Sequence, residues 1–227
     1  MTAAHTPPKD VFYTSAHRRA QERAECRPLA DRVVDAIVRD EIDDFYGGFI
    51  ASRDFFHLAT VDGEGRPTVS YKGGAPGVVA VVDPRTIAFP HFDGNGMFLS
   101  VGNAEDTRRI GLLFIDLEKP NRLRLQAVVE QVSDDPVLLA RWPGAQLVVI
   151  ARVESVFHNC GRYIHRHERV ASSPYVPDEQ GTAPTPAWKR IDMVQDVLTE
   201  GDRHRTAAEG GTITFEQYVG RLIEGTS

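Results

Sequence analysis

Cysteine is scarce in this sequence. The 227 residues include two cysteines, Cys26 and Cys160, and these form no CxxC pair. Two isolated cysteines build no disulfide framework, so packing is the expected role of both. The sequence also lacks an apolar run long enough to span a bilayer, and its N-terminus lacks the basic and then apolar pattern of a signal peptide. We therefore expect a cytoplasmic protein with no membrane partner.

An excess of positive charge is absent as well. The 26 lysines and arginines are outnumbered by 32 aspartates and glutamates, which gives a formal net charge of −6. A chain with this balance is a poor general binder of nucleic acid or of anionic membranes. The hydrophobic fraction of 41% and the charged fraction of 26% are those of an ordinary globular protein. Nucleic acid is therefore not an expected partner.

The fingerprints of several enzyme classes are missing. There is no GxGxxG, no GxxxxGK[ST] and no GxSxG with a suitable Asp and His, which disfavours the P-loop and hydrolase classes. One His/Cys cluster stands out, formed by His158, Cys160, His165 and His167. If this stretch is helical, His165 and His167 face different ways, whereas zinc ligands must converge on one point. We expect no metal site.

Helical patterns occupy the first fifty residues, after a polar arm (MTAAHTPPKDVF). The segment TSAHRRAQERAEC predicts a helix with Thr14 or Ser15 as its N-cap. Beyond Pro28, apolar residues recur every three to five positions from Leu29 to Ile50. This spacing predicts a second, amphipathic helix, with Gly47-Gly48 as its candidate break.

From residue 55 the pattern changes to short β-branched and aromatic runs separated by tight turns. We expect strands at 55–62, 67–72, 78–83, 87–92, 109–118, 122–133 and 145–157, with a short helix in DDPVLLARW between the last two. Strands joined mostly by turns favour an antiparallel barrel or sandwich over a doubly wound sheet. The stretch CGRYIHRHER then predicts a helix, a Pro- and Ser-rich loop covers 170–186, and PAWKRIDMVQDVL begins a helical C-terminal segment.

Two polar loops at strand ends carry the chemistry. One is SYKGGAPG (70–77), in which Lys72 precedes glycines that let the backbone bend around a flat or anionic group. The other is FPHFDGNGMFLSVGN (89–103), where glycines lead into an expected short helix whose N-terminus suits phosphate. Asn95 in this loop either donates its amide to a ligand or caps the helix. A ring system with a phosphate tail would use both loops.

The ordered set of segments resembles one family. FFHLATVDGEGRPTVSYKGGAPG, VDPRTIAF, FDGNGMFLSVGN, GLLFID and RLRLQAVVE follow one another over residues 45 to 160 as in the pyridoxamine 5′-phosphate oxidase-related FMN-binding split-barrel family. The resemblance implies a mainly β fold, a six-stranded antiparallel split barrel with a helical N-terminal extension and C-terminal helices. It also implies a homodimer that binds FMN at the subunit interface. We accordingly divide the chain into an N-terminal arm with helices (1–50) and an FMN-binding domain (51–227).

The same resemblance implies which residues bind the cofactor. The residues that it assigns to the flavin ring are Ser70, Tyr71, Lys72, Gly73, Phe89 and Pro90. It assigns the phosphate to the turn of Asn95, Gly96 and Met97, with Ser100 following. Arg122 is assigned a contact with the flavin of the partner subunit. Lys72 could serve either the N1/O2 edge of the ring or the phosphate, and the sequence does not decide. The Arg-Lys pair that the biosynthetic oxidases carry in the phosphate turn is absent here.

The expected function is that of a flavoprotein, an oxidoreductase that moves a hydride or electrons between FMN and a small-molecule substrate. No catalytic acid or base can be named, since the flavin supplies the chemistry. Two alternatives stay open because fold does not fix function. One is a non-catalytic flavin- or haem-binding module, and the other is an F420-dependent reductase. The substrate, the electron donor and the role of the 170–186 loop are not encoded in any motif.

Overall fold

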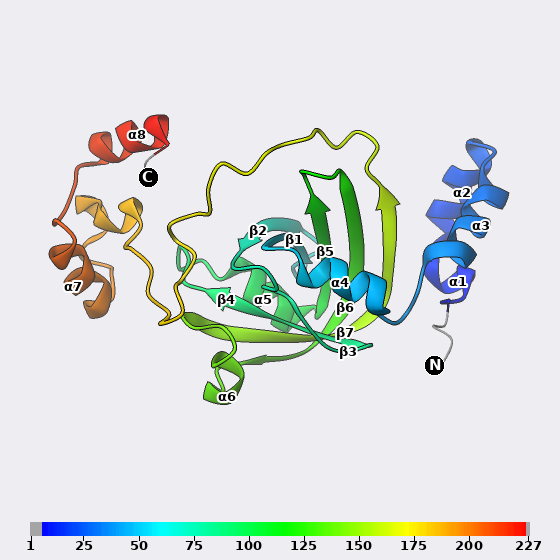
Figure 1. Cartoon of the computed structure of the whole chain (residues 1–227), viewed down its shortest axis with the longest axis horizontal. Coiled ribbons are helices and arrows are strands. Elements are labelled where there is room, and N and C mark those ends of the chain that lie inside the picture. Colours follow the sequence, from blue (N-terminus) through cyan, green and yellow to red (C-terminus); the bar gives the residue numbers. More distant parts are fainter. Residues whose placement is uncertain (1–5, 226–227) are drawn as a thin grey trace. The chain divides into compact units, whose positions relative to one another are not determined.

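The structure is a computed structural model that describes residues 6–225. The chain forms two compact units, one ending at Ala171 and the other beginning at Ser172 (Figure 1). The first unit holds the sheet and six helices: α1 Lys9–Phe12, α2 Ser15–Arg23, α3 Arg27–Ile37, α4 Asp44–Ala51, α5 Leu99–Asp106 and α6 Pro136–Leu139. Its strands are β1 Phe55–Val61, β2 Pro67–Gly73, β3 Ala80–Asp83, β4 Thr86–Phe92, β5 Arg109–Asp116, β6 Asn121–Ser133 and β7 Ala145–Cys160.

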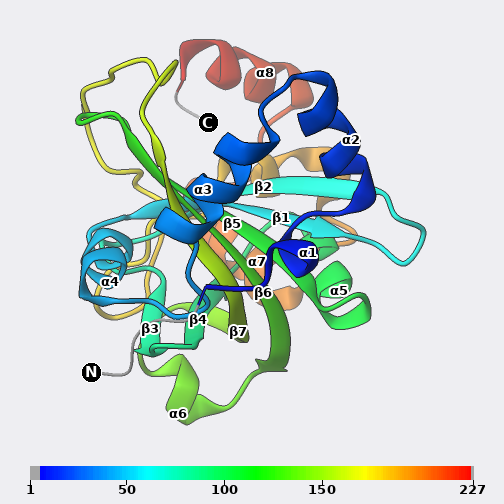
Figure 2. The ribbon, with the colours of Figure 1, turned by 90° about the vertical axis from the view of Figure 1, so that its right-hand side faces the viewer.

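All seven strands join one antiparallel sheet, in the order β2-β1-β5-β6-β7-β4-β3. The long strands β6 and β7 extend past their neighbours, so that β7 pairs with β6 along most of its length and with β4 near its start. Register shifts interrupt the β6–β7 ladder after Gln126 and after Val129. Such irregularities bend strands and increase their twist, and in Figure 2 the ribbons of β6 and β7 run at a steep angle to those of β1 and β2. The mainly β, antiparallel prediction is confirmed, with seven strands in place of six.

Alternation along the strands separates an inward from an outward face. On β1 the even-numbered residues Phe56, Leu58 and Thr60 are buried, while Ala59 between them is exposed. The register places these residues beside the buried even-numbered residues of β5, so both strands turn the same side inward. Phe56 and Phe114 are fully buried. Removing such a side chain from water stabilises the fold by roughly 1.5–3 kcal/mol.

The N-terminal helices differ in part from the prediction. Thr14 caps α2 as expected, since its hydroxyl accepts a hydrogen bond from the His17 amide. A single helix over 29–50 was wrong, because α3 ends at Ile37 and α4 begins at Asp44. Arg39 in the gap pairs with Val156 of β7 through two backbone hydrogen bonds, and Asp43 caps α4. The helix therefore breaks where the chain joins the sheet, and Gly47 and Gly48 lie inside α4.

Two further predictions concern the segments around β7. The expected short helix before it is confirmed as α6, which Asp135 caps by accepting from the Val137 amide. The helix expected in CGRYIHRHER was wrong. The sheet continues to Cys160, and residues 161–171 contain a turn and no helix or strand. Pairing with Asn121 of β6 extends β7 to Cys160, past the residue at which the sequence pattern placed its end.

The second unit is small and contains two 3-10 turns and two helices. These are Ala187–Arg190, Asp192–Val194, α7 Glu200–Ala208 and α8 Phe215–Glu224. A buried ion pair joins its turns to α7: Lys189 Nζ lies 3.0 Å from Asp202 Oδ1, and both side chains are less than a tenth exposed. Thr199 caps α7 by accepting a hydrogen bond from the Asp202 amide.

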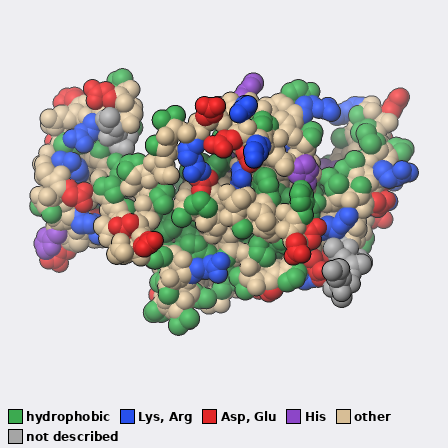
Figure 3. Space-filling model, viewed as in Figure 1, with side chains coloured by type: hydrophobic (Ala, Val, Ile, Leu, Met, Phe, Trp, Pro, Cys, Tyr) green, Lys and Arg blue, Asp and Glu red, His purple; other side chains and the backbone are tan. Residues whose placement is uncertain are grey.

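The surface is mixed in character. Acidic, basic and apolar side chains are interspersed on the face shown in Figure 3, so neither sign of charge dominates that face. Among residues 6–225, no helix combines the length and the apolar content needed to cross a membrane.

Candidate functional site

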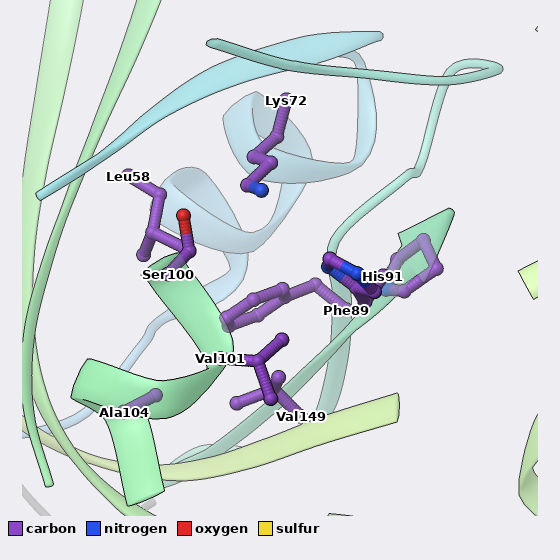
Figure 4. A pocket seen from close by; sticks show the side chains of 9 residues that line it. Leu58, Lys72, Phe89, His91, Ser100, Val101, Ala104 and Val149 are labelled. Carbon is purple, nitrogen blue, oxygen red and sulfur yellow. The ribbon is translucent and has the colours of Figure 1, made fainter. Parts of the chain in front are cut away.

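A hollow opens at one end of the inward face, between β1, β2, β4 and the start of α5 (Figure 4). Its empty volume is about 250 Å³, part of which is open to solvent. Most of its wall is apolar, and the polar side chains come from three different elements. The lining residues are Leu58, Lys72, Phe89, Pro90, His91, Ser100, Val101, Ala104 and Val149.

Lys72 brings a half-buried cation into this hollow. Ser70 and Lys72 share the inward face of β2, because Ser70 pairs with the buried Leu58. Figure 4 shows the Lys72 ammonium directed into the space between Ser100 and His91. Burial alone lowers the pKa of Lys72, and within the described part of the chain no hydrogen bond or ion pair engages its ammonium. A cation held in this way can bind an anionic ligand.

Helix α5 supplies the second polar group of the hollow. Two hydrogen bonds fix this helix to β1, from Asn103 Nδ2 to Thr60 Oγ1 (3.0 Å) and from Thr107 Oγ1 to the Val61 carbonyl (2.8 Å). The arrangement places Ser100, in the first turn of α5, against β2, where its hydroxyl lies 2.9 Å from that of Ser70. Hydroxyl groups can donate to or accept from a ligand.

The turn before α5 leaves the helix start open. Asn95 Oδ1 accepts a hydrogen bond from the Met97 amide, 3.1 Å away, so Asn95 stabilises the turn and does not cap α5. Gly96 and Phe98 both have positive φ, and no side chain caps the helix. The first amides of α5 are therefore available to an acceptor. The alternative that Asn95 caps the helix was therefore wrong, whereas donation of its amide to a ligand stays a prediction.

His91 is a site residue that sequence reasoning missed. It lies on β4, its ring centroid is 5.1 Å from that of Phe98, and it lines the hollow beside Lys72. Burial is the main cause that lowers the pKa of His91, and the Lys72 cation lowers it further, while Asp93 acts in the opposite direction. Alternation along IAFPHF could have placed His91 and Phe89 on the same side of the strand.

The glycines of SYKGGAPG serve packing within the chain. The Gly74 amide donates to the Asp54 carbonyl (2.8 Å) and the Gly77 amide to the Arg53 carbonyl (2.9 Å), so the loop folds back on the segment before β1. A Cβ on Gly74 would lie 2.6 Å from a methyl group of Val78, and Gly77 has a φ of +81°. Lys72 lines the hollow, whereas the glycines that follow it do not.

The predicted site residues divide into three groups. Lys72, Phe89, Pro90 and Ser100 line the hollow, and Ser70 reaches it through its contact with Ser100. A second group forms the exposed turn that leads into α5: Asn95, Gly96 and Met97. The third group lies outside the hollow and consists of Tyr71, Gly73 and Arg122.

The third group lies on the outward face of the sheet. Tyr71 is 64% exposed, and its ring stacks on that of Phe55 at 5.2 Å. Three buried polar atoms of this face have no hydrogen-bond partner among the described residues: His57 Nδ1, Arg122 Nε and Asn159 Oδ1. Arg122 and Asn159 are register neighbours on β6 and β7. Polar atoms buried without partners are costly, so this face has capacity for further hydrogen bonds.

Residues 42–158, just over half of the chain, match the family model described as pyridoxamine 5′-phosphate oxidase. The match spans the sheet, the hollow and both polar loops. The chain belongs to the pyridoxamine 5′-phosphate oxidase family. A comparison with curated proteins gave no match.

Solved structures resemble part of this chain. HupZ of Group A Streptococcus is 18% identical, with 56% of this chain and 99% of that chain covered and a TM-score of 0.43. A candidate pyridoxamine 5′-phosphate oxidase from Lactobacillus delbrueckii is 22% identical, with 52% and 94% covered and a TM-score of 0.42. An FMN-binding protein from Syntrophomonas wolfei is 13% identical, with 63% and 94% covered and a TM-score of 0.40.

The structure groups no metal-binding set. Within residues 6–225, no three side chains of His, Cys, Asp or Glu come together in a way that could hold a metal ion. His158 instead contacts Asn121 Oδ1 across the β6–β7 ladder.

Proposed function

We propose that this protein binds FMN beside Lys72 and moves a hydride or electrons between FMN and a small-molecule substrate. The observation that carries the proposal is the Lys72 ammonium, which is half-buried in a largely apolar hollow and has no partner among residues 6–225. A half-buried charge without a partner costs stability, and an anionic ligand would offset that cost. Membership of the pyridoxamine 5′-phosphate oxidase family makes FMN the first ligand to test.

The residues of the hollow fit parts of such a cofactor. Phe89 and Pro90 offer an apolar wall for a ring system, Lys72 offers a cation, and the Ser70–Ser100 pair offers hydroxyl groups. When bound, FMN would supply the redox chemistry itself, and the protein would supply binding, orientation and electrostatics. The Arg-Lys pair of the biosynthetic oxidases is absent, so we assign phosphate recognition to Lys72 and the open amides of α5.

The outward face of the sheet carries features that favour contact with a second subunit. We propose that two copies of the chain form a homodimer through this outward face. Exposed Val69 and Tyr71, and the unpartnered nitrogen of His57, are the features of that face which support the proposal.

A charge placed on the outward face tests the dimer. We expect the wild-type protein to elute as a dimer in size-exclusion chromatography with light scattering, and Tyr71→Glu to elute as a monomer, because burying the carboxylate would be costly. Val137→Glu is the matched control, since Val137 is 82% exposed on α6, away from this face. A wild-type monomer at all concentrations would refute the dimer.

A binding experiment followed by reduction tests the function. FMN fluorescence should be quenched on titration with the protein, and riboflavin, which lacks the phosphate, should bind more weakly. Bleaching of bound FMN by NAD(P)H under anaerobic conditions would support an oxidoreductase. Binding without bleaching by any donor would leave a flavin carrier. Exclusive binding of haem or of a deazaflavin, each recognised by its own absorption spectrum, would reject the FMN proposal.

A further inference from the structure

We propose that His91 and Lys72 form one oxyanion site, and that His91 takes up a proton when a phosphate group enters the hollow. This inference rests on the proposed function in that it concerns the same hollow. It adds His91, which the family resemblance did not assign to the site, and it defines the ligand by its negative charge. The occupant is a phosphate monoester or inorganic phosphate.

The geometry brings the two side chains together from different strands. His91 lies on β4 and pairs with Leu147 of β7, whereas Lys72 lies on β2, at the opposite edge of the sheet order. Curling of the sheet brings both to the same hollow, and Figure 4 shows the His91 ring and the Lys72 ammonium on opposite sides of one space. An anion between them would face a nitrogen from each side.

The imidazole of His91 is available to hydrogen-bond a ligand. The Phe98 ring lies beside it at 5.1 Å, and no hydrogen bond engages its side chain within the described ranges. A histidine that served only the core would have its nitrogens paired or packed. The side chain is instead partly open, and it lines a space in which Lys72 is the one cationic side chain among the lining residues that the structure describes. One nitrogen of the ring can therefore donate to an oxyanion.

Electrostatics keeps His91 uncharged when the hollow holds no anion. Burial lowers the pKa of His91 below the ordinary 6.5, the Lys72 cation lowers it further, and Asp93 raises it by a smaller amount. The imidazole is therefore neutral near pH 7, and the hollow carries one positive charge. A nearby anion favours the charged form of histidine, so a bound phosphate would raise the pKa of His91.

Proton uptake follows from this difference between the free and bound states. At a pH between the two pKa values, binding of phosphate draws a proton onto His91, and the affinity for phosphate falls as the pH rises through this window. Below the window His91 is already protonated, and above it His91 stays neutral in both states. Burial lowers the pKa of Lys72 from the ordinary 10.5, and Lys72 is the cation that disfavours protonation of His91 before an anion binds.

The first experiment needs no ligand. The His91 ring proton is followed by NMR against pH in the apoprotein and assigned by its absence in His91→Gln. We expect a pKa below the ordinary value in the wild type and an upward shift in Lys72→Met, which removes the repelling charge. An ordinary pKa in the wild type, or no change in Lys72→Met, would overturn the inference whether or not the protein binds FMN.

The second experiment measures protons during binding. Calorimetric titrations with inorganic phosphate, FMN and riboflavin are run near pH 7 in two buffers of different ionisation enthalpy. The second ionisation of the phosphate itself also lies near this pH, so the proton uptake of the wild type is compared with that of His91→Gln. We expect greater uptake by the wild type with phosphate and with FMN, and no difference between the two proteins with riboflavin. The variant should also bind phosphate about tenfold more weakly at low pH, through loss of a charge-assisted hydrogen bond. His204→Gln, on the exposed surface of α7, is the control and should behave as the wild type.

The outcomes separate this inference from the proposed function. Competition between phosphate and FMN would identify the cofactor's own phosphate as the occupant, and simultaneous binding would identify the phosphate of a substrate; both support the site. Phosphate binding with greater proton uptake by the wild type than by His91→Gln, and without FMN binding, would keep the site and reject the flavoprotein. FMN binding with equal uptake by the two proteins, or the same excess with riboflavin, would refute the role of His91 and leave the flavoprotein standing.

Discussion

Replacing Lys72 with methionine should stabilise the apoprotein and weaken cofactor binding. Methionine keeps an unbranched side chain of similar length, so the packing of the stem is largely retained. The substitution removes an ammonium whose pKa burial lowers and which has no partner among residues 6–225. Stability that is given up for a binding site is commonly recovered when the site is removed.

The magnitude follows from the burial of the charge. A buried polar group without a partner costs about 1–3 kcal/mol, and Lys72 is only half-buried, so solvent screening reduces the cost to about 1 kcal/mol. For a chain of this size that corresponds to a rise in melting temperature of about 2–4 °C. The folded state lowers the pKa of Lys72, so the free-energy cost of burying the ammonium is present at pH values below the folded-state pKa. This cost disappears as the pH rises from the folded-state pKa to the ordinary 10.5. The gain from methionine should therefore be full near pH 7 and shrink at strongly alkaline pH.

The assay is calorimetric unfolding of the apoprotein, paired with FMN titration. We expect Lys72→Met to melt higher than the wild type and to bind FMN about 10- to 100-fold more weakly, through loss of a charge-assisted hydrogen bond. Lys119→Met is the matched control, because Lys119 lies exposed in the turn before β6 and should change neither property. A lower melting temperature together with unchanged FMN affinity would refute the reasoning about Lys72.

Three further substitutions test the packing beside the site and the ion pair of the second unit. Gly74→Ala should cost about 1–3 kcal/mol of unfolding free energy, because its Cβ would lie 2.6 Å from a Val78 methyl group. Gly48→Ala in α4 is the comparison, because a Cβ at Gly48 would have no atom within 4 Å. This substitution should stabilise the fold by up to about 1 kcal/mol. Equal effects of the two substitutions in thermal unfolding would contradict the packing argument. Burial raises the pKa of Asp202, but hydrogen bonds from Lys189 and its other neighbours outweigh burial and lower it overall. Asp202 therefore contributes stability at pH values above the pKa of the unfolded state, and this stability is lost as the pH falls through the pKa of the folded state. Hydrogen exchange of α7 should show this loss at acid pH in the wild type but not in Asp202→Asn.

The strands were predictable because their pattern is local. Turn residues bound each run, and alternation on β1 and β6 records which side faces the core, so all seven strands lie close to their expected positions. The break between α3 and α4 was not predictable, because its cause is the pairing of Arg39 with Val156, more than a hundred residues away. The end of β7 depends in the same way on its partner β6.

The candidate site was predictable in part for the same reason. Lys72 and Ser100 were found because their loops carry a recognisable order of residues. Tyr71 was grouped with Lys72 although adjacent residues of a strand point to opposite faces, a rule that the sequence itself could have supplied. His91 was missed because its role depends on the distance between β2 and β4, which are brought together only by the curling of the sheet.

The absorption spectrum of the purified protein shows whether the hollow beside Lys72 holds FMN. The spectrum is recorded before FMN is added, and again after addition and desalting. We expect the two visible bands of oxidised flavin to survive desalting in proportion to the protein, and Lys72→Met to retain less FMN. A colourless wild-type protein that releases all added FMN would contradict this expectation.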